Sequence, residues 1–370
     1  MQENASQSKV RVVPLSRPRA LAAAAALVMA FSAPAMAVIQ SSVGFTDNGG
    51  RRVIIPGNSA TLPSVIDAPN FGVNTGNGFG ENLYGLTSNG FMGWPIGPRA
   101  FLGARHVSLS PGGTLAFDNQ TFTVASVTNM FATFQGPNNT TFQGNSDISI
   151  YTINAGDPSF SRFSPLFSDS DNFSAGGELV VYGRGTNRGT TITATSSGGA
   201  TRGWAWGGND GQVSWGTNRA EAITAVALGG SENATVVLSY NFSPEADPDG
   251  TLFEGGLTGG DSSGAVFART STGQWKLAGI NSAVDGPVGY TDDQSLAQQA
   301  VVFDASGLFA SISDGLPNNG SYILRTSGRT SSFSTFVGYS EYADVLQTFV
   351  PEPTTLTLLC GVIVLGLRRR

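Results

Sequence analysis

Apolar and polar residues alternate in short runs along most of the chain. Residues 121–127 read Thr-Phe-Thr-Val-Ala-Ser-Val, and residues 147–153 read Asp-Ile-Ser-Ile-Tyr-Thr-Ile. A period of two places successive side chains on opposite faces of a strand, and clusters of turn residues separate the runs. Between the two ends of the chain, only residues 292–303 have the spacing of a short amphipathic helix. The pattern predicts an all-β protein built from many short strands.

The first 37 residues have the layout of a secretory signal peptide. Basic residues between positions 9 and 19 precede an apolar stretch at 21–31, and Ala35-Met36-Ala37 supplies small residues at a cleavage site. This order of charge, apolar core and small residues is typical of a signal peptide rather than of a structural helix. We therefore expect signal peptidase to remove residues 1–37, so that the exported chain begins near Val38.

A second targeting pattern occupies residues 350–370. Val350-Pro351-Glu352-Pro353 leads into a mostly apolar run at 354–367 that ends in three arginines. The run is shorter than the roughly 20 residues that cross a bilayer. The layout resembles the PEP-CTERM sorting tails of Gram-negative bacteria, which implies an exosortase-type processing enzyme and delivery to the cell envelope, cell surface or extracellular matrix. The alternative is a short anchor with cytoplasmic arginines; in both cases we expect membrane contact only through the termini.

Between these ends the chain is acidic. Residues 38–350 hold 13 Lys and Arg against 24 Asp and Glu, a net charge of −11. No basic surface is left for nucleic acid, which is therefore not expected as a partner. The single cysteine, Cys360, lies in the tail, so the body must fold without an internal disulfide. A body of roughly 310 residues buries enough apolar surface to do so.

Three short segments carry candidate chemistry. The only histidine, His106, ends an apolar run, Asp147 begins the alternating run at 147–153, and Ser262 lies in the sequence Gly-Asp-Ser-Ser-Gly at 260–264. A serine hydroxyl becomes a nucleophile when an imidazole accepts its proton and a carboxylate holds that imidazole in the right tautomer. The chain therefore contains a base, its carboxylate partner and a nucleophile, 41 and then 115 positions apart.

The order His, Asp, Ser resembles that of the chymotrypsin-like serine proteases. The resemblance covers roughly residues 40–312 and is carried mainly by those three motifs. It implies two six-stranded Greek-key β-barrels with the active site in the cleft between them, and secreted serine endopeptidase activity. His106, Asp147 and Ser262 would then be the catalytic residues, and neither a cofactor nor a metal is expected.

The same resemblance divides the body into two barrels. We expect the first barrel at 38–163, with His106 and Asp147, and the second at 164–312, with Ser262. The second would open with the strand at 177–183 and a Gly-x-Gly turn at 183–185. Residues 313–349 would be a spacer to the sorting tail or an extra strand.

The nucleophile loop departs from the family pattern at one position. The resemblance implies that the backbone N–H groups of Gly260 and Ser262 form the oxyanion hole. The family usually has a second glycine after the nucleophile, whereas this chain has Ser263, which leaves Ser263 as an alternative nucleophile. In the family the aspartate at position 261 pairs with a new N-terminal amine, and here Val38 or one of the arginines at 51–52 would have to take that part.

Specificity is expected from Gly256, Ser282, Ala283 and Val284, the positions that match the family's substrate pocket. Gly256 stands at the base of the pocket, where an acidic residue would favour Lys or Arg substrates, and Glu254 is two positions away. Val284 would narrow the pocket. We therefore expect a preference for small apolar residues before the scissile bond.

Two other interpretations fit the same sequence. The body could be a catalytically inactive protease-like protein, or an unrelated β-sandwich, acting in either case as a surface or matrix adhesin sorted by its tail. Acidic residues at 245–249 also suggest calcium, although their spacing is not that of a full ligand loop. The expected partners are a protein or peptide substrate, the sorting enzyme and signal peptidase.

Overall fold

The structure, a computed structural model, describes most of the body of the chain. The described ranges are 39–40, 83–135, 141–209, 213–227, 234–243, 247–251, 254–312 and 322–350. The predicted signal peptide and all of the predicted sorting tail after Val350 lie outside them. No helix within these ranges is long and apolar enough to cross a membrane. The described residues are mostly strands, which confirms the all-β fold class.

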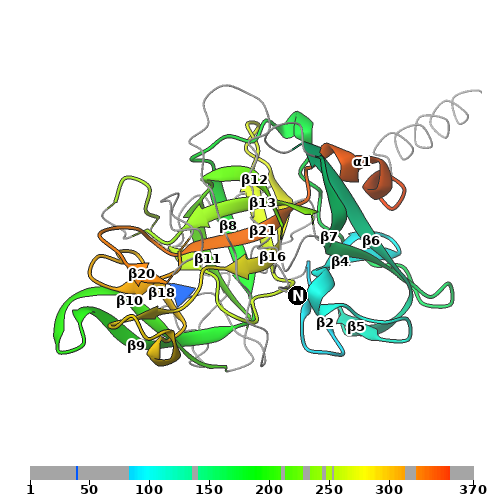
Figure 1. Cartoon of the computed structure of the whole chain (residues 1–370). Coiled ribbons are helices and arrows are strands. Elements are labelled where there is room, and N and C mark those ends of the chain that lie inside the picture. The colour runs from blue at the N-terminus through cyan, green and yellow to red at the C-terminus, as the bar shows by residue number, and fades with distance from the viewer. Residues whose placement is uncertain are drawn as a thin grey trace, which may run out of the picture.

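Six strands close into the first barrel, at the right of Figure 1. They are β2 (Gly85–Thr87), β3 (Met92–Gly97), β4 (Ala100–Gly103), β5 (Thr114–Phe117), β6 (Gln120–Gln135) and β7 (Thr141–Ile153). Their order is β2-β3-β4-β7-β6-β5, so β4 pairs with β7 rather than with β5. This is a Greek key, and it brings the end of β4 beside the middle of β7, where Gly103 faces Ser149.

The second body is a seven-stranded antiparallel sheet in the order β11-β8-β15-β16-β21-β13-β12. Its strands are β8 (Glu178–Gly183), β11 (Ser214–Arg219), β12 (Ala222–Ala227), β13 (Ala234–Asn241), β15 (Ala265–Arg269), β16 (Trp275–Val284) and β21 (Ser331–Phe336). The family resemblance implied six strands. The seventh arises because one chain segment bends at residues 220–221 and is divided into β11 and β12.

Strands β11 and β12 are the two edge strands of this sheet, and the bend connects them. On one side the N–H of Ala220 donates to the carbonyl of Gly177, just before β8, at 2.9 Å. On the other side the N–H of Glu221 donates to the carbonyl of Ser239 in β13, also at 2.9 Å. Counted as continuous chain segments, with β11 and β12 as one, the second body therefore has six strands.

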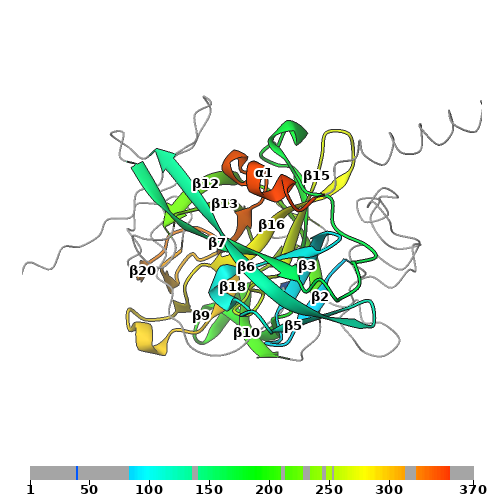
Figure 2. The ribbon, with the colours of Figure 1, turned by 90° about the vertical axis from the view of Figure 1, so that its right-hand side faces the viewer.

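Residues beyond 312 complete this second body. Strand β21 lies between β16 and β13, inside the sheet. The single α-helix of the described residues, α1 (Ser340–Gln347), follows it and lies against the long β6–β7 hairpin (Figure 2). Much of the segment expected as a spacer or extra strand is thus built into the fold, and a boundary at 312 leaves the sheet without an internal strand.

Smaller sheets lie beside the second body, at the left of Figure 1. One contains β9 (Thr186–Thr195), β10 (Gly198–Asn209) and β18 (Ala300–Val302), and another contains β17 (Val288–Gly289), β19 (Phe309–Ala310) and β20 (Ile323–Leu324). A short pair joins β1 (Ile39–Gln40) to β14 (Gly255–Gly256). The 3-10 turns are η2 (Arg105–Val107), η4 (Asp169–Asp171) and η5 (Gln294–Leu296).

The helix expected at 292–303 is not present. Residues 294–296 form only the η5 turn, and 300–302 form β18, which pairs with β10. Backbone pairing with a strand about a hundred residues away outweighs the weak helical spacing, because tertiary contacts override local propensity in short segments.

A tryptophan of the first barrel ties the two bodies together. Trp94 of β3 is fully buried, and its ring lies 5.8 Å from that of Tyr182 and 5.4 Å from that of Phe267, both in the second sheet. These tilted and edge-on contacts are the arrangements that aromatic pairs favour. The bodies therefore share one apolar cluster, which fixes their relative position.

Candidate active site

His106 lies in the η2 turn, directly after β4 ends. Its backbone N–H donates to Oδ1 of Asp147 at 2.9 Å, and its ring Nδ1 lies 2.8 Å from Oδ2 of the same carboxylate. One carboxylate therefore holds both the backbone and the ring of His106. This fixes the imidazole in a single orientation and favours the tautomer with its proton on Nδ1.

Asp147 is buried and is held by the second body. Its strand, β7, belongs to the first barrel, but its backbone N–H donates to Thr235 Oγ1 at 3.1 Å, and its carbonyl accepts a bond from Thr335 Oγ1 at 3.3 Å. Thr235 lies in β13 and Thr335 in β21. No local pattern in the sequence marks these two threonines, because only the packing of the two bodies brings them to Asp147.

Ser262 completes the group from the loop between β14 and β15. Its Oγ lies 2.7 Å from His106 Nε2, on the ring edge opposite Asp147. Ser262 is half-buried, in contrast to its buried neighbours Asp261 and Ser263. The structure thus brings together His106, Asp147 and Ser262, which stand 156 positions apart from first to last.

Three backbone N–H groups of the nucleophile loop have no acceptor among the described residues: those of Gly259, Gly260 and Ser262. The N–H groups of Asp261, Ser263 and Gly264 donate to the carbonyls of Thr258, Asn281 and Asp261. Gly260 has φ +92°, which glycine adopts without strain. Both positions expected to form an oxyanion hole are therefore among the three with unpaired N–H groups.

Asp261 is fully enclosed beneath this loop. Its carboxylate accepts hydrogen bonds from the N–H of Gly185 at 3.0 Å, and from the N–H and hydroxyl of Thr258 at 2.7 and 3.1 Å. Burial raises the pKa of the Asp261 carboxyl well above its usual range. A Cβ at position 183 would overlap this carboxylate, so the Gly-x-Gly turn at 183–185 both makes room for Asp261 and donates to it. The N-terminal partners expected for Asp261 lie outside the described side chains.

Ser263 is not placed as a nucleophile. It is 2% exposed, and its hydroxyl donates to the carbonyl of Met92 at 2.7 Å while it accepts from the N–H of Ala104 at 2.9 Å. The only proton of this hydroxyl is therefore donated to Met92, and the imidazole Nε2 faces Ser262 instead.

The expected pocket residues lie on neighbouring segments of the second body. Ser332 in β21 faces Val284, and its hydroxyl accepts from the N–H of Leu257 at 3.0 Å, which draws the segment after Gly256 toward β16. The Ser282 hydroxyl lies 2.6 Å from Thr335 Oγ1, so it supports the carbonyl contact of Asp147. Ala283 packs in a small apolar cluster with Val226, Val237 and Phe333.

Apolar side chains surround Gly256. A Cβ at this position would lie 2.6 Å from Val301 Cγ1 and 3.2 Å from Phe242 Cδ2. Glu254 is buried away from it, accepting bonds from the N–H groups of Ser243 and Thr251, each at 2.9 Å. Burial raises the pKa of the Glu254 carboxyl to about 8. Glu254 therefore stabilises its own loop by these hydrogen bonds.

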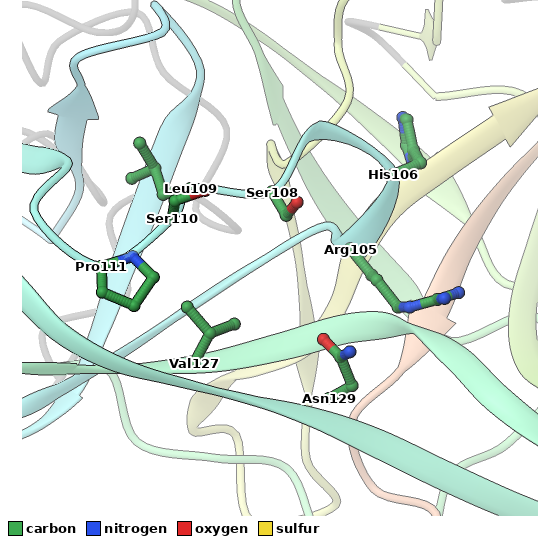
Figure 3. Close-up of a pocket in the computed structure, with 8 residues that line it drawn as sticks. All are labelled: Arg105, His106, Ser108, Leu109, Ser110, Pro111, Val127 and Asn129. Carbon is green, nitrogen blue, oxygen red and sulfur yellow. The ribbon is translucent and has the colours of Figure 1, made fainter.

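A cavity of about 440 Å³ lies on the first-barrel side of His106 (Figure 3). Arg105, Leu109, Val127 and Asn129 contribute to its lining, and Figure 3 shows that they come from the η2 turn, the loop after it and β6. None of the four pocket positions expected from the sequence lines this cavity. The sequence does not predict this cavity, because its lining residues lie on two separate segments, 105–111 and β6, that only the fold brings together.

Comparisons with known proteins identify no family. No family model matches the chain, and no curated protein matches it. Among solved structures, human heparin binding protein is similar at 17% identity and TM-score 0.38, over 74% of this chain and 93% of that one. A variant of the same human protein is similar at 15% identity and TM-score 0.39, over 74% and 94%. Likeness at this level does not bear on activity.

Proposed function

We propose that the protein is a serine endopeptidase that cleaves peptide bonds through an acyl-enzyme. The observation that carries the proposal is the His106 ring, whose two nitrogens lie 2.8 Å from Asp147 and 2.7 Å from Ser262. Nucleophile, base and orienting carboxylate within hydrogen-bond reach are what serine hydrolysis requires. The division of these groups between the two bodies, with His106 and Asp147 from the first and Ser262 from the second, agrees with a protease-like fold.

The proposed first step forms the acyl-enzyme. The Ser262 hydroxyl transfers its proton to His106 Nε2 as its Oγ bonds to the scissile carbonyl carbon. The resulting imidazolium is stabilised by Asp147, and it returns the proton to the amine as the C–N bond breaks. Water, activated by the same imidazole, then hydrolyses the ester and restores the hydroxyl.

The unpaired N–H groups of Gly260 and Ser262 support a role in this reaction. Peptide donors fixed by neighbouring backbone bonds need no rearrangement to receive a developing oxyanion. Removing one such donor typically costs about 3 kcal/mol of transition-state stabilisation. We therefore assign these two groups to the oxyanion hole.

We further propose that the enzyme prefers small apolar side chains before the scissile bond. The support is the crowding of Gly256 by Val301 and Phe242 and the placement of Glu254 in its own loop. Peptides with Ala or Val before the cleaved bond should be hydrolysed faster than those with Lys or Arg. Faster cleavage of a lysyl peptide would contradict this preference without contradicting the triad.

A fluorophosphonate probe tests the activity. The expected result is a covalent adduct that peptide mass spectrometry maps to Ser262, and that is absent from Ser262→Ala and His106→Ala. Both substitutions should also reduce peptide hydrolysis by about 10⁴-fold or more. An adduct on Ser263 would overturn the assignment of the nucleophile. A folded wild-type protein that takes no adduct and cleaves no peptide would favour the non-catalytic adhesin.

We also propose export to the cell envelope, cell surface or extracellular matrix, with processing by signal peptidase and an exosortase-type enzyme. The support is the sequence of the two termini. Mass spectrometry of the protein recovered from a Gram-negative host should show an N-terminus near Val38 and a cleavage close to Pro351. A mature protein that keeps residues 1–37 would contradict the export proposal.

A further inference from the structure

Ser263 has an unfavourable backbone conformation for a serine. Its φ is +65°, in the left-handed region that glycine occupies freely and other residues rarely adopt. It is 2% exposed and directly follows Ser262. A strained residue persists where its surroundings hold it in place, and such residues cluster at functional sites. The contacts of the Ser263 side chain show what holds it.

Ser263 bonds to three separate points of the first barrel. Its hydroxyl donates to the carbonyl of Met92 at 2.7 Å and accepts from the N–H of Ala104 at 2.9 Å. Its carbonyl accepts from Nε1 of Trp94 at 3.0 Å. Its own N–H donates to the carbonyl of Asn281 in the second body, at 3.0 Å. One residue therefore joins the nucleophile loop to β3, to the end of β4 and to β16.

The first barrel has a matching gap. A Cβ at position 103 would lie 2.8 Å from Ser263 Oγ, closer than real side chains allow. Glycine at this position lets the hydroxyl reach Ala104, which is two residues before His106. The bond therefore acts on the peptide that leads into the histidine turn.

We propose that Ser263 is a positioning residue whose hydroxyl sets the distance between His106 and Ser262. The inference rests on the proposed serine-protease function. His106 belongs to the first barrel and Ser262 to the second body. The hydroxyl of Ser263, the residue after Ser262, bonds to Ala104, two residues before His106, and so links the two bodies beside the pair. Misplacement of reacting groups by about 1 Å can cost about 100-fold in rate, so a clamp at this point controls the chemistry without touching the substrate.

Two substitutions separate the hydroxyl from the backbone conformation. Both Ser263→Ala and Ser263→Gly delete the hydroxyl, but only glycine relieves the positive φ. If the hydroxyl positions the pair, both variants should lose kcat by about 10- to 100-fold with KM changed less than about twofold, while the glycine variant melts at the higher temperature. If instead the less stable variant, Ser263→Ala, lost much more kcat than Ser263→Gly, the role of Ser263 would be merely structural and the proposal would be overturned.

Moving the hydroxyl into the first barrel provides a second control. In Ser263→Gly, the further change Gly103→Ser places a hydroxyl in the vacated volume, within reach of the Met92 carbonyl, which lies 3.9 Å from a Cβ at 103. Both groups belong to the first barrel, so the new bond does not link the two bodies, and the double variant should have the same low kcat as Ser263→Gly. Recovery of kcat to nearly the wild-type value would show that filling the volume is enough, and would overturn the proposal.

The single histidine allows a test that does not need turnover. Its ring nitrogens give unambiguous ¹⁵N resonances, because the chain has no other histidine. The shift of His106 Nε2 reports its hydrogen bond to Ser262, and Ser262→Ala defines the value without that bond. Ser263→Gly should move the Nε2 shift toward the Ser262→Ala value; an unchanged shift would overturn the proposal. If the wild type shows no activity, the proposed function fails while this measurement still decides the clamp.

A matched control removes a different buried hydroxyl. Ser164 is 1% exposed, and its hydroxyl has no partner among the described atoms. Ser164→Ala should leave kcat and the Nε2 shift as in wild type. A comparable loss in this control would show that any buried serine affects the site, and would overturn the specific role of Ser263.

Discussion

At the scale of single residues, the arrangement depends on one carboxylate that holds a histidine by two bonds. Asp147→Asn preserves shape but replaces one carboxylate oxygen with an N–H donor, which favours the wrong imidazole tautomer. We expect kcat to fall by about 10⁴-fold with little change in the free energy of unfolding. Steady-state kinetics and urea unfolding check this. As a control, Asp157→Asn, which alters a carboxylate bonded to Thr123 in the first barrel, should keep wild-type kcat.

The glycine at position 183 is required by the carboxylate beside it. In Gly183→Ala the added methyl group would overlap Asp261, and overpacking of a closed site typically costs about 1 to 3 kcal/mol. Urea unfolding should show this loss, together with weaker fluorophosphonate labelling because the loop of Ser262 shifts. Gly156→Ala is the control, since a Cβ there has nothing within 4 Å. Equal stability of the two variants would contradict the tight fit.

At the scale of elements, α1 supports the strand that carries Asp147. Tyr342 is fully buried, and its hydroxyl lies 2.5 Å from that of Ser146. Tyr342→Ala should destabilise the protein by about 3 to 5 kcal/mol, as large aromatic truncations do. On the same helix Val345 is 36% exposed, so Val345→Ala should change the unfolding midpoint little. Similar losses in the two variants would mean that α1 does not pack as described.

The loop that contains Glu254 makes stability depend on pH. Because the pKa is raised to about 8 in the folded state, the folded protein keeps a proton that the unfolded chain has released from its carboxyl above about pH 4.5. This stabilisation is complete below that pH and is lost as pH rises toward 8, by at most about 1.4 kcal/mol per pH unit. Urea unfolding from pH 5 to 8 should show a smaller decline in Glu254→Gln. Identical slopes would refute this contribution.

At the scale of the whole molecule, the chain beyond residue 312 is part of the fold. Strand β21 pairs with both β13 and β16, and α1 packs against β6 and contacts β7 through the hydroxyls of Tyr342 and Ser146. A chain ending at 312 should therefore fail to fold, whereas one ending at 350 should unfold cooperatively. Circular dichroism during thermal unfolding measures this. A cooperative, protease-resistant chain ending at 312 would contradict the architecture.

The sequence predicted those features of the molecule that local patterns determine. Alternation of apolar and polar residues gave the all-β class, because a strand exposes its two faces in turn. The helix at 292–303 failed for the complementary reason, since a weak local period was overridden by pairing of β18 with β10. The motifs around His106, Asp147 and Ser262 predicted three candidate catalytic side chains, because serine hydrolysis requires an imidazole, a carboxylate and a hydroxyl.

The tertiary structure alone decided how those side chains meet. No local pattern marks Thr235 and Thr335, which hold the backbone of Asp147, or the cavity beside His106, because their partners come from distant strands. The two adjacent serines at 262 and 263 are alike in sequence, yet one faces the imidazole and the other is bonded across the barrels. The sequence determines which functional groups these side chains carry. Their orientation depends on packing between residues that lie far apart along the chain, and only the tertiary structure decides it.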